Sequence, residues 1–204
     1  PDKGRRGITA FYVPADAPGL VTEAIEMSGD HPVGRLIFTD CVLPAESLIG
    51  EVGGGFKLAM QTLDTFRVTV GAAAVGMARR ALDEALAHVK QRHQFGKALI
   101  EQQLVAGHIA DMTVELDAAR LLVYRAAWLK DRDGDRHTLP VSVAKLHATE
   151  AASRIIDTAV QLFGGLGVTR NHIVERLYRE IRPLRIYEGT SEIQRLIIAR
   201  ELNR

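Results

Sequence analysis

The sequence predicts a mainly α-helical fold, in which a C-terminal up-down helical bundle follows a few strands of an incomplete β-domain. Two observations support this prediction. After residue 55, apolar residues recur at three- and four-residue steps, the period of helices that bury one face. Between residues 7 and 50, β-branched and aromatic residues are separated by proline and glycine. We therefore expect residues 1–54 to be the remnant of a β-domain and residues 55–204 to form the bundle.

Two stretches of the first part are typical of strands. GITAFYVPAD is rich in β-branched and aromatic residues and is closed by the Pro18-Gly19 turn pair. In GRLIFTDCVLP, Leu36, Phe38 and Asp40 alternate with Ile37, Thr39 and Cys41. An isolated small sheet is marginally stable at best, so this β part is expected to lack some of its strands.

Five helices are predicted after the glycines at 53–55. Three long ones span residues 56–92, 99–131 and 140–163, and two shorter ones span 171–181 and 190–202. The first begins its buried stripe with Phe56, Met60, Leu63 and Phe66, and the second carries Ile109, Met112, Leu116, Ala119, Val123 and Ala126. Pro140 is tolerated in a first turn, Asp133-Gly134-Asp135 breaks the second helix, and Thr190 or Ser191 caps the last one. Short loops between long helices predict antiparallel packing.

The composition excludes several classes of protein. The chain has 204 residues, of which 47% are hydrophobic and 25% charged, with a net charge of +1. This is the composition of a globular protein, and the near-neutral charge argues against nucleic-acid or membrane-surface binding. The single Cys41 rules out an internal disulfide and favours a reducing compartment. No apolar run is long enough for a membrane span. Because the chain opens at Pro1 without methionine, we expect a fragment or a processed piece.

No metal site is predicted. The sequence has no nucleophile elbow, phosphate-binding loop or paired helical histidines. The histidines are scattered without the spacing of metal ligands: His88, His93, His108, His137, His147 and His172. Structural roles are expected for all of them.

Two glycine-containing segments leave alternatives open. RHQFGKALIEQQ, residues 92–103, interrupts two helices with a cation, an aromatic residue, a glycine and a second cation. It is either a helix-breaking loop or a contact with an anionic, ring-bearing cofactor. QLFGGLGVTR, residues 161–170, is either a helix end followed by a turn or a place where the backbone approaches a phosphate or an adenine.

A carboxylate stands in an unusual place near the end of the chain. Glu188 lies between Tyr187 and Gly189, where a turn meets the last helix. Neither core packing nor a solvated helix face requires an acid there, so Glu188 is a candidate for chemistry.

These motifs together resemble the acyl-CoA dehydrogenase family of flavoproteins, of the medium- and short-chain type. The resemblance rests on RHQFGKALIEQQ, DTAVQLFGGLGVTR and above all IYEGTSEIQRLIIAR, in this order, and it covers essentially the whole chain. GEVGGGFKLAMQTLDTFR and LIFTDCVLPAESLIGE also look like the family's junction between sheet and bundle. Family members are roughly twice as long, so the resemblance implies the C-terminal half of such an enzyme.

The resemblance assigns Glu188 as the catalytic base. Such an enzyme removes the α-proton of an acyl-CoA thioester while FAD accepts a β-hydride, which leaves a trans-2-enoyl-CoA. A base of this kind needs direct reach and a raised pKa, which burial supplies. Gly189 lets the substrate pass close to the backbone, and the backbone N–H of the base helps to hold the thioester oxygen. Some members carry the base just before the arginine matched here by Arg67, but this chain has Phe66 there.

The resemblance also implies contacts with cofactor and substrate. Residues matching positions that bind FAD are Arg92, Gln94, Phe95, Gln102, Gln103, Gln161, Leu162, Phe163, Gly164, Gly165, Thr190 and Glu192. All but the last two are implied to act across a dimer interface. Asp64, Arg67 and Arg200 match positions near the CoA portion, although a helical i,i+3 ion pair is an alternative for Asp64 and Arg67. SGDHPVGRL, residues 28–36, departs from the family's pattern beside the flavin.

Other functions remain as alternatives. The chain is a non-catalytic or split-subunit assembly module, or it belongs to an acyl-CoA oxidase-like flavoenzyme. The dehydrogenase interpretation implies an acyl-CoA substrate, a homo-oligomer built as a dimer of dimers, and an electron-transferring flavoprotein as acceptor. It places the protein in a bacterial cytoplasm or the mitochondrial matrix.

Overall fold

The computed structural model describes residues 4–133 and 137–204. The chain divides into two compact units, Pro1–Leu63 and Asp64–Arg204. Helix α1 (Gly55–Gln91) begins in the first unit and continues through the second. The division therefore falls inside this helix, whereas we expected a boundary between residues 54 and 55. Of the predicted break at Asp133-Gly134-Asp135, Asp133 is still helical, and residues 134 and 135 lie outside the described residues.

The first unit contains short antiparallel strands. β1 (Ala10–Phe11) pairs with β4 (Leu48–Ile49), and β2 (Leu20–Ile25) pairs with β3 (Val33–Phe38). The β2–β3 hairpin runs in register from Leu20 opposite Phe38 to Ile25 opposite Val33. The predicted alternation up to Cys41 is wrong in its last part, because Asp40 adopts a φ of 47° that a strand does not allow.

A glycine joins the strands to α1. Gly53 has a φ of 81°, and a Cβ built on it would lie 2.6 Å from the carbonyl oxygen of Arg6. Its N–H donates to Thr9 Oγ1 at 3.0 Å, and the N–H of Gly55 donates to the Ile8 carbonyl at 2.9 Å. Only glycine combines this backbone angle with so close an approach.

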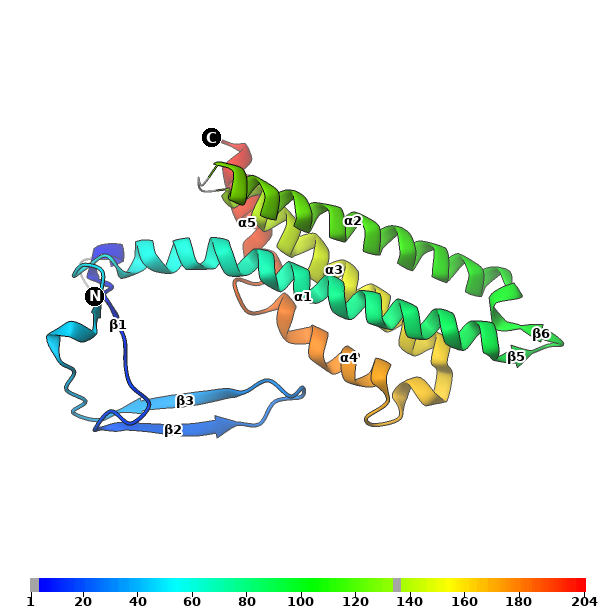
Figure 1. Ribbon diagram of the computed structural model, residues 1–204, viewed down its shortest axis with the longest axis horizontal. Coiled ribbons are helices and arrows are strands. Elements are labelled where there is room, and N and C mark those ends of the chain that lie inside the picture. The colour runs from blue at the N-terminus through cyan, green and yellow to red at the C-terminus, as the bar shows by residue number, and fades with distance from the viewer. Residues whose placement is uncertain (1–3, 134–136) are drawn as a thin grey trace. The chain divides into compact units, whose positions relative to one another are not determined.

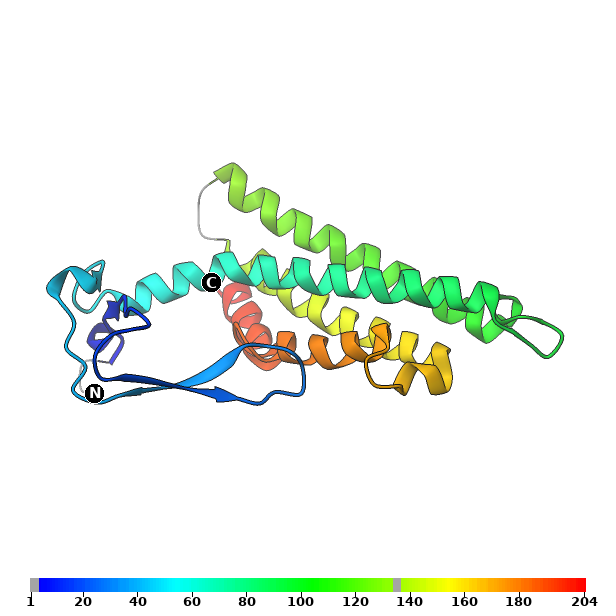
Figure 2. The ribbon, with the colours of Figure 1, turned by 60° about the horizontal axis from the view of Figure 1, so that its bottom comes forward.

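The second unit is a helical bundle, which confirms the predicted fold. After α1 come α2 (Gln103–Asp133), α3 (Thr138–Phe163), α4 (Ile173–Ile181) and α5 (Ser191–Leu202). The three long helices run side by side in both views (Figures 1 and 2). Helix α3 packs against α2, α4 and α5, so it is the central element of this unit.

Small side chains line the buried face of α3. Its buried alanines are Ala144, Ala148, Ala151, Ala152 and Ala159. They form one cluster with Ile155 and Ile156 and with the stripe predicted for α2, in which Met112, Leu116, Ala119, Val123 and Ala126 are buried and Ile109 is partly buried. Alanine lets helix axes approach closely at little cost in side-chain entropy.

The predicted buried stripe at the start of α1 is wrong at Phe66, which is 51% exposed. The helix instead turns Asp64, Arg67 and Val68 inward. Asp64 and Arg67 pair with each other, which allows two charged residues to occupy the inner face. An interpretation that assumes exposed charges therefore predicts the wrong buried face for this part of α1.

The connection between α1 and α2 contains structure that we did not predict. β5 (His93–Gln94) and β6 (Lys97–Ala98) form a hairpin whose two-residue turn, Phe95-Gly96, has φ values of 55° and 78°. Residues Leu99–Glu101 then form a 3₁₀ turn, so α2 begins at Gln103 and not at residue 99. The Glu101 carboxylate accepts a hydrogen bond from the Ala98 N–H at 3.1 Å and so caps this short turn.

Candidate active site

Glu188 lies in a strained turn. The turn separates the 3₁₀ segment Arg182–Arg185 from α5, and Glu188 and Gly189 have φ values of 58° and 89°. A left-handed backbone is uncommon for a residue other than glycine, and it costs of the order of 1–3 kcal/mol. Such strain persists only where the surrounding structure holds the backbone in place, and it occurs often at functional sites.

Side chains from three helices hold the carbonyls of this turn. Arg67 of α1 donates to the Glu188 carbonyl at 2.9 Å, and Lys145 of α3 donates to the Gly189 carbonyl at 2.9 Å. The amide of Gln194 on α5 donates to both carbonyls, each at 3.1 Å. These donors fix the backbone on either side of the Glu188 side chain.

A buried ion pair supports Arg67. Asp64 and Arg67 are 3% and 4% exposed, and Arg67 Nη1 donates to Asp64 Oδ1 at 3.3 Å. The other oxygen of Asp64 accepts from the hydroxyl of Thr138, the first residue of α3, at 3.1 Å. The i,i+3 pair that we considered as an alternative is therefore present. Contact of Asp64 or Arg67 with CoA stays a prediction.

A second polar cluster attaches both ends of the turn to α3. Glu150 accepts from Arg185 Nε at 2.9 Å and from the Ser191 hydroxyl at 2.5 Å. Burial raises the pKa of Glu150, but hydrogen bonds from Ser191 and Arg185 outweigh this effect and leave its pKa below the usual value. The Glu150 carboxylate thus joins the segment before the turn to the first residue of α5.

One oxygen of the Glu188 carboxylate has no hydrogen-bond partner. Its residue is partly buried, and no donor among the described residues bonds to the buried Oε2 atom. Buried polar atoms almost always have a hydrogen-bond partner. Burial and the adjacent Glu188 carboxylate raise the pKa of the Tyr187 phenol. A carboxylate oxygen that is shielded from water and unbonded is suited to accept a proton from a ligand.

Gly189→Ala is expected to destabilise the protein by about 1–3 kcal/mol, because alanine would adopt a left-handed backbone there. The new Cβ would also lie 3.0 Å from Gln194 Nε2. Thermal unfolding of the full-length protein measures the loss. Gly76→Ala is the matched control, since a Cβ at this α1 position meets nothing within 4 Å, and alanine favours the helix by about 1 kcal/mol. Equal stabilities of the two variants would contradict the prediction.

The residues predicted at 92–103 lie on and around the β5–β6 hairpin. Phe95 is at its tip and is 91% exposed. Arg92 and Gln103 are exposed, and the amide of Gln102 donates to the Gln94 carbonyl at 3.4 Å. An exposed ring beside an arginine charge and glutamine amides fits an anionic ligand that carries an aromatic ring.

The residues predicted at 161–165 lie at the same end of the bundle as the hairpin. Phe163, at the end of α3, stacks on His88 near the end of α1 with 4.2 Å between ring centroids. Gln161, Gly164 and Gly165 are exposed, Leu162 is partly buried, and a Cβ on either glycine would meet nothing within 4 Å. This end lies roughly 30 Å from Arg67 along α1, by the helical rise of about 1.5 Å per residue. One chain therefore presents two separate groups of predicted residues.

Three further predicted residues lie on or beside α5. Thr190 caps the helix, as expected, by accepting from the Ile193 N–H at 3.3 Å. Glu192 is exposed in the first turn, and hydrogen bonds from its own N–H and from Thr190 lower its pKa. Arg200 is exposed and pairs with Glu201 at 3.3 Å. It lies about 15 Å along the helix from Thr190, outside the cluster around the turn.

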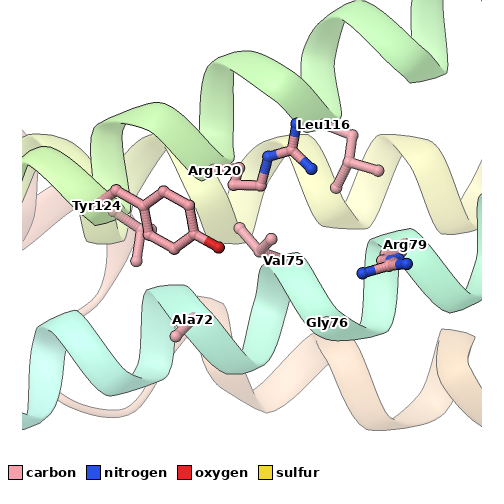
Figure 3. Close-up of a pocket in the computed structure, with 8 residues that line it drawn as sticks. Ala72, Val75, Gly76, Arg79, Leu116, Arg120 and Tyr124 are labelled. Carbon is pink, nitrogen blue, oxygen red and sulfur yellow. The ribbon is translucent and has the colours of Figure 1, made fainter.

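A groove of about 230 Å³ lies between α1 and α2 (Figure 3). Leu116 and Val123 are buried in its floor, and Arg79, Arg120 and Tyr124 line it at the exposed side. Both arginines pair with acids of their own helices. None of the predicted site residues lines this groove.

The described ranges contain no group of three histidine, cysteine, aspartate or glutamate residues arranged to hold a metal ion. Across residues 4–133 and 137–204, none of the helices is long and apolar enough to span a membrane.

Comparison with known proteins identifies the family. The family model described as acyl-CoA dehydrogenase, C-terminal domain, matches residues 53–203. The chain belongs to the acyl-CoA dehydrogenase family. The mitochondrial short-chain specific acyl-CoA dehydrogenase of Rattus norvegicus is 45% identical over 202 residues, which are 98% of this chain and 49% of the relative.

Solved structures of the acyl-CoA dehydrogenase family have the same fold as this chain. The structure of butyryl-CoA dehydrogenase from Megasphaera elsdenii is 40% identical with a TM-score of 0.95, and the match covers 100% of this chain and 54% of that one. A structure described as the electron-transferring flavoprotein of Acidaminococcus fermentans is 38% identical with the same TM-score and the same coverage. The chain spans about half the length of the relatives it matches.

Three residues of this acyl-CoA dehydrogenase chain were missed by sequence reasoning. Lys145, Gln194 and Glu150 all form hydrogen bonds with the turn or its flanks. The only available signal was a lysine in the otherwise weakly polar helix segment PVSVAKLHATEAA. Lys145 is fully buried, and burial together with the charge of Arg67 lowers its pKa to about 8.

Proposed function

We propose that this chain is the C-terminal half of an FAD-dependent acyl-CoA dehydrogenase in which Glu188 is the α-proton-abstracting base. The observation that carries the proposal is the buried Oε2 of Glu188, which has no hydrogen-bond partner. Glu188 lies in a strained turn whose carbonyls accept hydrogen bonds from side chains of three helices. A base must be free to accept a proton and must be fixed in position, and this carboxylate meets both conditions. Membership of the family supplies the reaction class.

Several residues of this chain have the chemistry that the proposed reaction requires. Glu188 takes the α-proton of an acyl-CoA thioester, and its backbone N–H helps to hold the thioester oxygen where negative charge develops. Gly189 adds no side chain beside the substrate. Bound FAD would supply the acceptor for the β-hydride, which would leave a trans-2-enoyl-CoA. Substrate contacts of Asp64, Arg67 and Arg200 belong to the same proposal.

Two parts of the chain are proposed to hold FAD. Thr190 and Glu192 serve the flavin of their own subunit. The hairpin residues Arg92, Gln94, Phe95, Gln102 and Gln103 and the α3-end residues Gln161, Leu162, Phe163, Gly164 and Gly165 serve the FAD of a neighbouring subunit. The separation of roughly 30 Å along α1 supports this division, because the two groups of residues are too far apart to share one small site.

The deciding experiment is the flavin absorbance spectrum of the full-length protein, titrated anaerobically with acyl-CoAs of increasing chain length. Bleaching by a short-chain acyl-CoA is the expected result, since the relatives include short-chain and butyryl-CoA dehydrogenases. A colourless, inert protein favours the non-catalytic module. Rapid re-oxidation by oxygen, with no need for an electron-transferring flavoprotein, favours an oxidase. A bacterial cytoplasm or the mitochondrial matrix is the proposed compartment.

The isolated chain is expected to associate. Val114, Leu121, Tyr124 and Trp128 form an exposed apolar stripe along α2, and each is more than half exposed. Such a stripe is typical of a surface that is covered in an assembly, and it supports the proposed dimer of dimers. Light scattering of the 204-residue chain should show a mass above that of the 22.4 kDa monomer, and a monomer at all concentrations would contradict this expectation.

A further inference from the structure

The ammonium of Lys145 is buried and bonded to the residue that follows the proposed base. It lies on the central helix α3, its side chain is fully buried, and its Nζ donates to the Gly189 carbonyl at 2.9 Å. That carbonyl is one peptide beyond Glu188. Lys145 therefore contacts the backbone of the turn and not the Glu188 carboxylate.

Burying this cation does not stabilise the fold. The pKa of Lys145 is about 8 in the folded protein against an ordinary value of 10.5. Between these two pH values the unfolded state binds more protons, so the stability of the native state rises with pH as the ammonium is lost. At neutral pH the charge is retained although it costs stability, and such a cost is common at functional sites.

Charged groups on α1, the turn, α3 and α5 change the pKa of this lysine. Arg67 of α1 lowers its pKa, whereas Glu188 of the turn, Glu150 of α3 and Glu192 of α5 raise it, and burial has the largest effect. The charge of Lys145 is therefore coupled to the charge of Glu188. Loss of the ammonium would weaken its hydrogen bond to Gly189, because a charge-assisted bond is roughly twice as strong as a neutral one.

We propose that Lys145 is a positioning residue for the Glu188 base: its ammonium fixes the Gly189 carbonyl and thereby keeps the Glu188 carboxylate in reach of the substrate α-proton. The inference rests on the proposed dehydrogenase function. It follows from one juxtaposition, a buried cation bonded to the residue next to Glu188, whose backbone is left-handed and whose Oε2 has no hydrogen-bond partner. Lys145 does not touch the substrate in this proposal, and it acts only through the turn.

The test compares Lys145→Met and Lys145→Arg in the full-length, FAD-loaded enzyme. In the methionine variant we expect kcat to fall by about 10- to 100-fold, the size of effect that small misplacements of a catalytic group cause. KM should change little, because substrate binding is not removed. Thermal stability should stay the same or rise, because a buried charge is replaced by an apolar side chain of similar length. A residue with only a structural role would give the opposite result, a loss of stability without loss of kcat.

The pH profile gives a second readout. In the unchanged enzyme, the rate of flavin bleaching should decline on the alkaline side with an apparent pKa near 8. Arginine stays charged throughout, so Lys145→Arg should lose this alkaline decline and recover part of the kcat that methionine loses. Lys90→Met, at an exposed position in the last turn of α1, is the matched control and should behave like the unchanged enzyme.

Each outcome decides the inference. Turnover of Lys145→Met within about twofold of the unchanged enzyme, or an alkaline decline that persists in Lys145→Arg, would overturn it. If the methionine variant does not fold, the pH profile of the arginine variant still decides. If the unchanged enzyme and the Lys90→Met control fail to bleach with every acyl-CoA, the proposed function fails. If both are active and the Lys145 variants are unaffected, only the role of Lys145 fails.

Discussion

Glu188→Gln is expected to lower the turnover of the full-length enzyme by about 10²–10⁴-fold, the usual contribution of a positioned general base. Glutamine keeps the size of the side chain and leaves the backbone bonds from Arg67, Lys145 and Gln194 in place. It has no carboxylate to accept the α-proton. Steady-state kinetics with a short-chain acyl-CoA measure the loss, and the flavin absorbance of the purified variant should show that FAD is still bound.

The control for this substitution is Glu84→Gln. Glu84 is on α1 and pairs with Arg80 at 2.8 Å on a solvent-exposed face, so removal of its charge should leave turnover unchanged. Both variants lose one negative charge. A difference between their turnovers therefore reflects the position of the residue and not the net charge of the protein. Near-normal turnover of Glu188→Gln with bound FAD would refute the assignment of the base.

Arg67→Met is expected to destabilise the full-length enzyme by about 3–5 kcal/mol, because it leaves the Asp64 carboxylate buried without its cation. Asp64 is 3% exposed, so water does not replace the lost partner. The variant also removes the donor to the Glu188 carbonyl, so turnover should fall together with stability. Urea denaturation followed by circular dichroism measures the free energy of unfolding.

A double-mutant cycle isolates the ion pair. Asp64→Asn removes the charge but keeps an acceptor for the Thr138 hydroxyl, and combined with Arg67→Met it should recover part of the lost stability. Contacting residues of one network typically couple by about 0.5–3 kcal/mol. Additive effects of the two substitutions would show that the pair is not coupled, in conflict with the 3.3 Å contact.

The helical bundle could be predicted from local patterns because buried residues recur at helical spacing along the long helices. Met112, Leu116, Ala119, Val123 and Ala126 recur at helical spacing, and all five are buried in α2. The α1 stripe failed at Phe66 because Asp64 and Arg67 neutralise each other in the interior, an arrangement that depends on α3 and on the turn. Periodicity assumes that charges face water, and it fails where two charges meet inside.

The hairpin between α1 and α2 was missed for a different reason. Its turn residues are Phe95 and Gly96, and only the second favours a positive φ on its own. Phe95 nevertheless has a φ of 55°. A pattern search for asparagine-glycine or aspartate-glycine turns could not have found it.

The sequence by itself determined the helices, a cap at Thr190 or Ser191 and the location of Glu188 at the joint before the last helix. Only the tertiary structure decided that this joint is strained, that Oε2 of Glu188 is buried and unbonded, and that Arg67, Lys145 and Gln194 hold it from three helices. Helical periodicity and capping depend on residues that are a few positions apart, so they can be predicted from the local sequence. The contacts that fix the base join residues up to 121 positions apart, and they exist only once the bundle has packed.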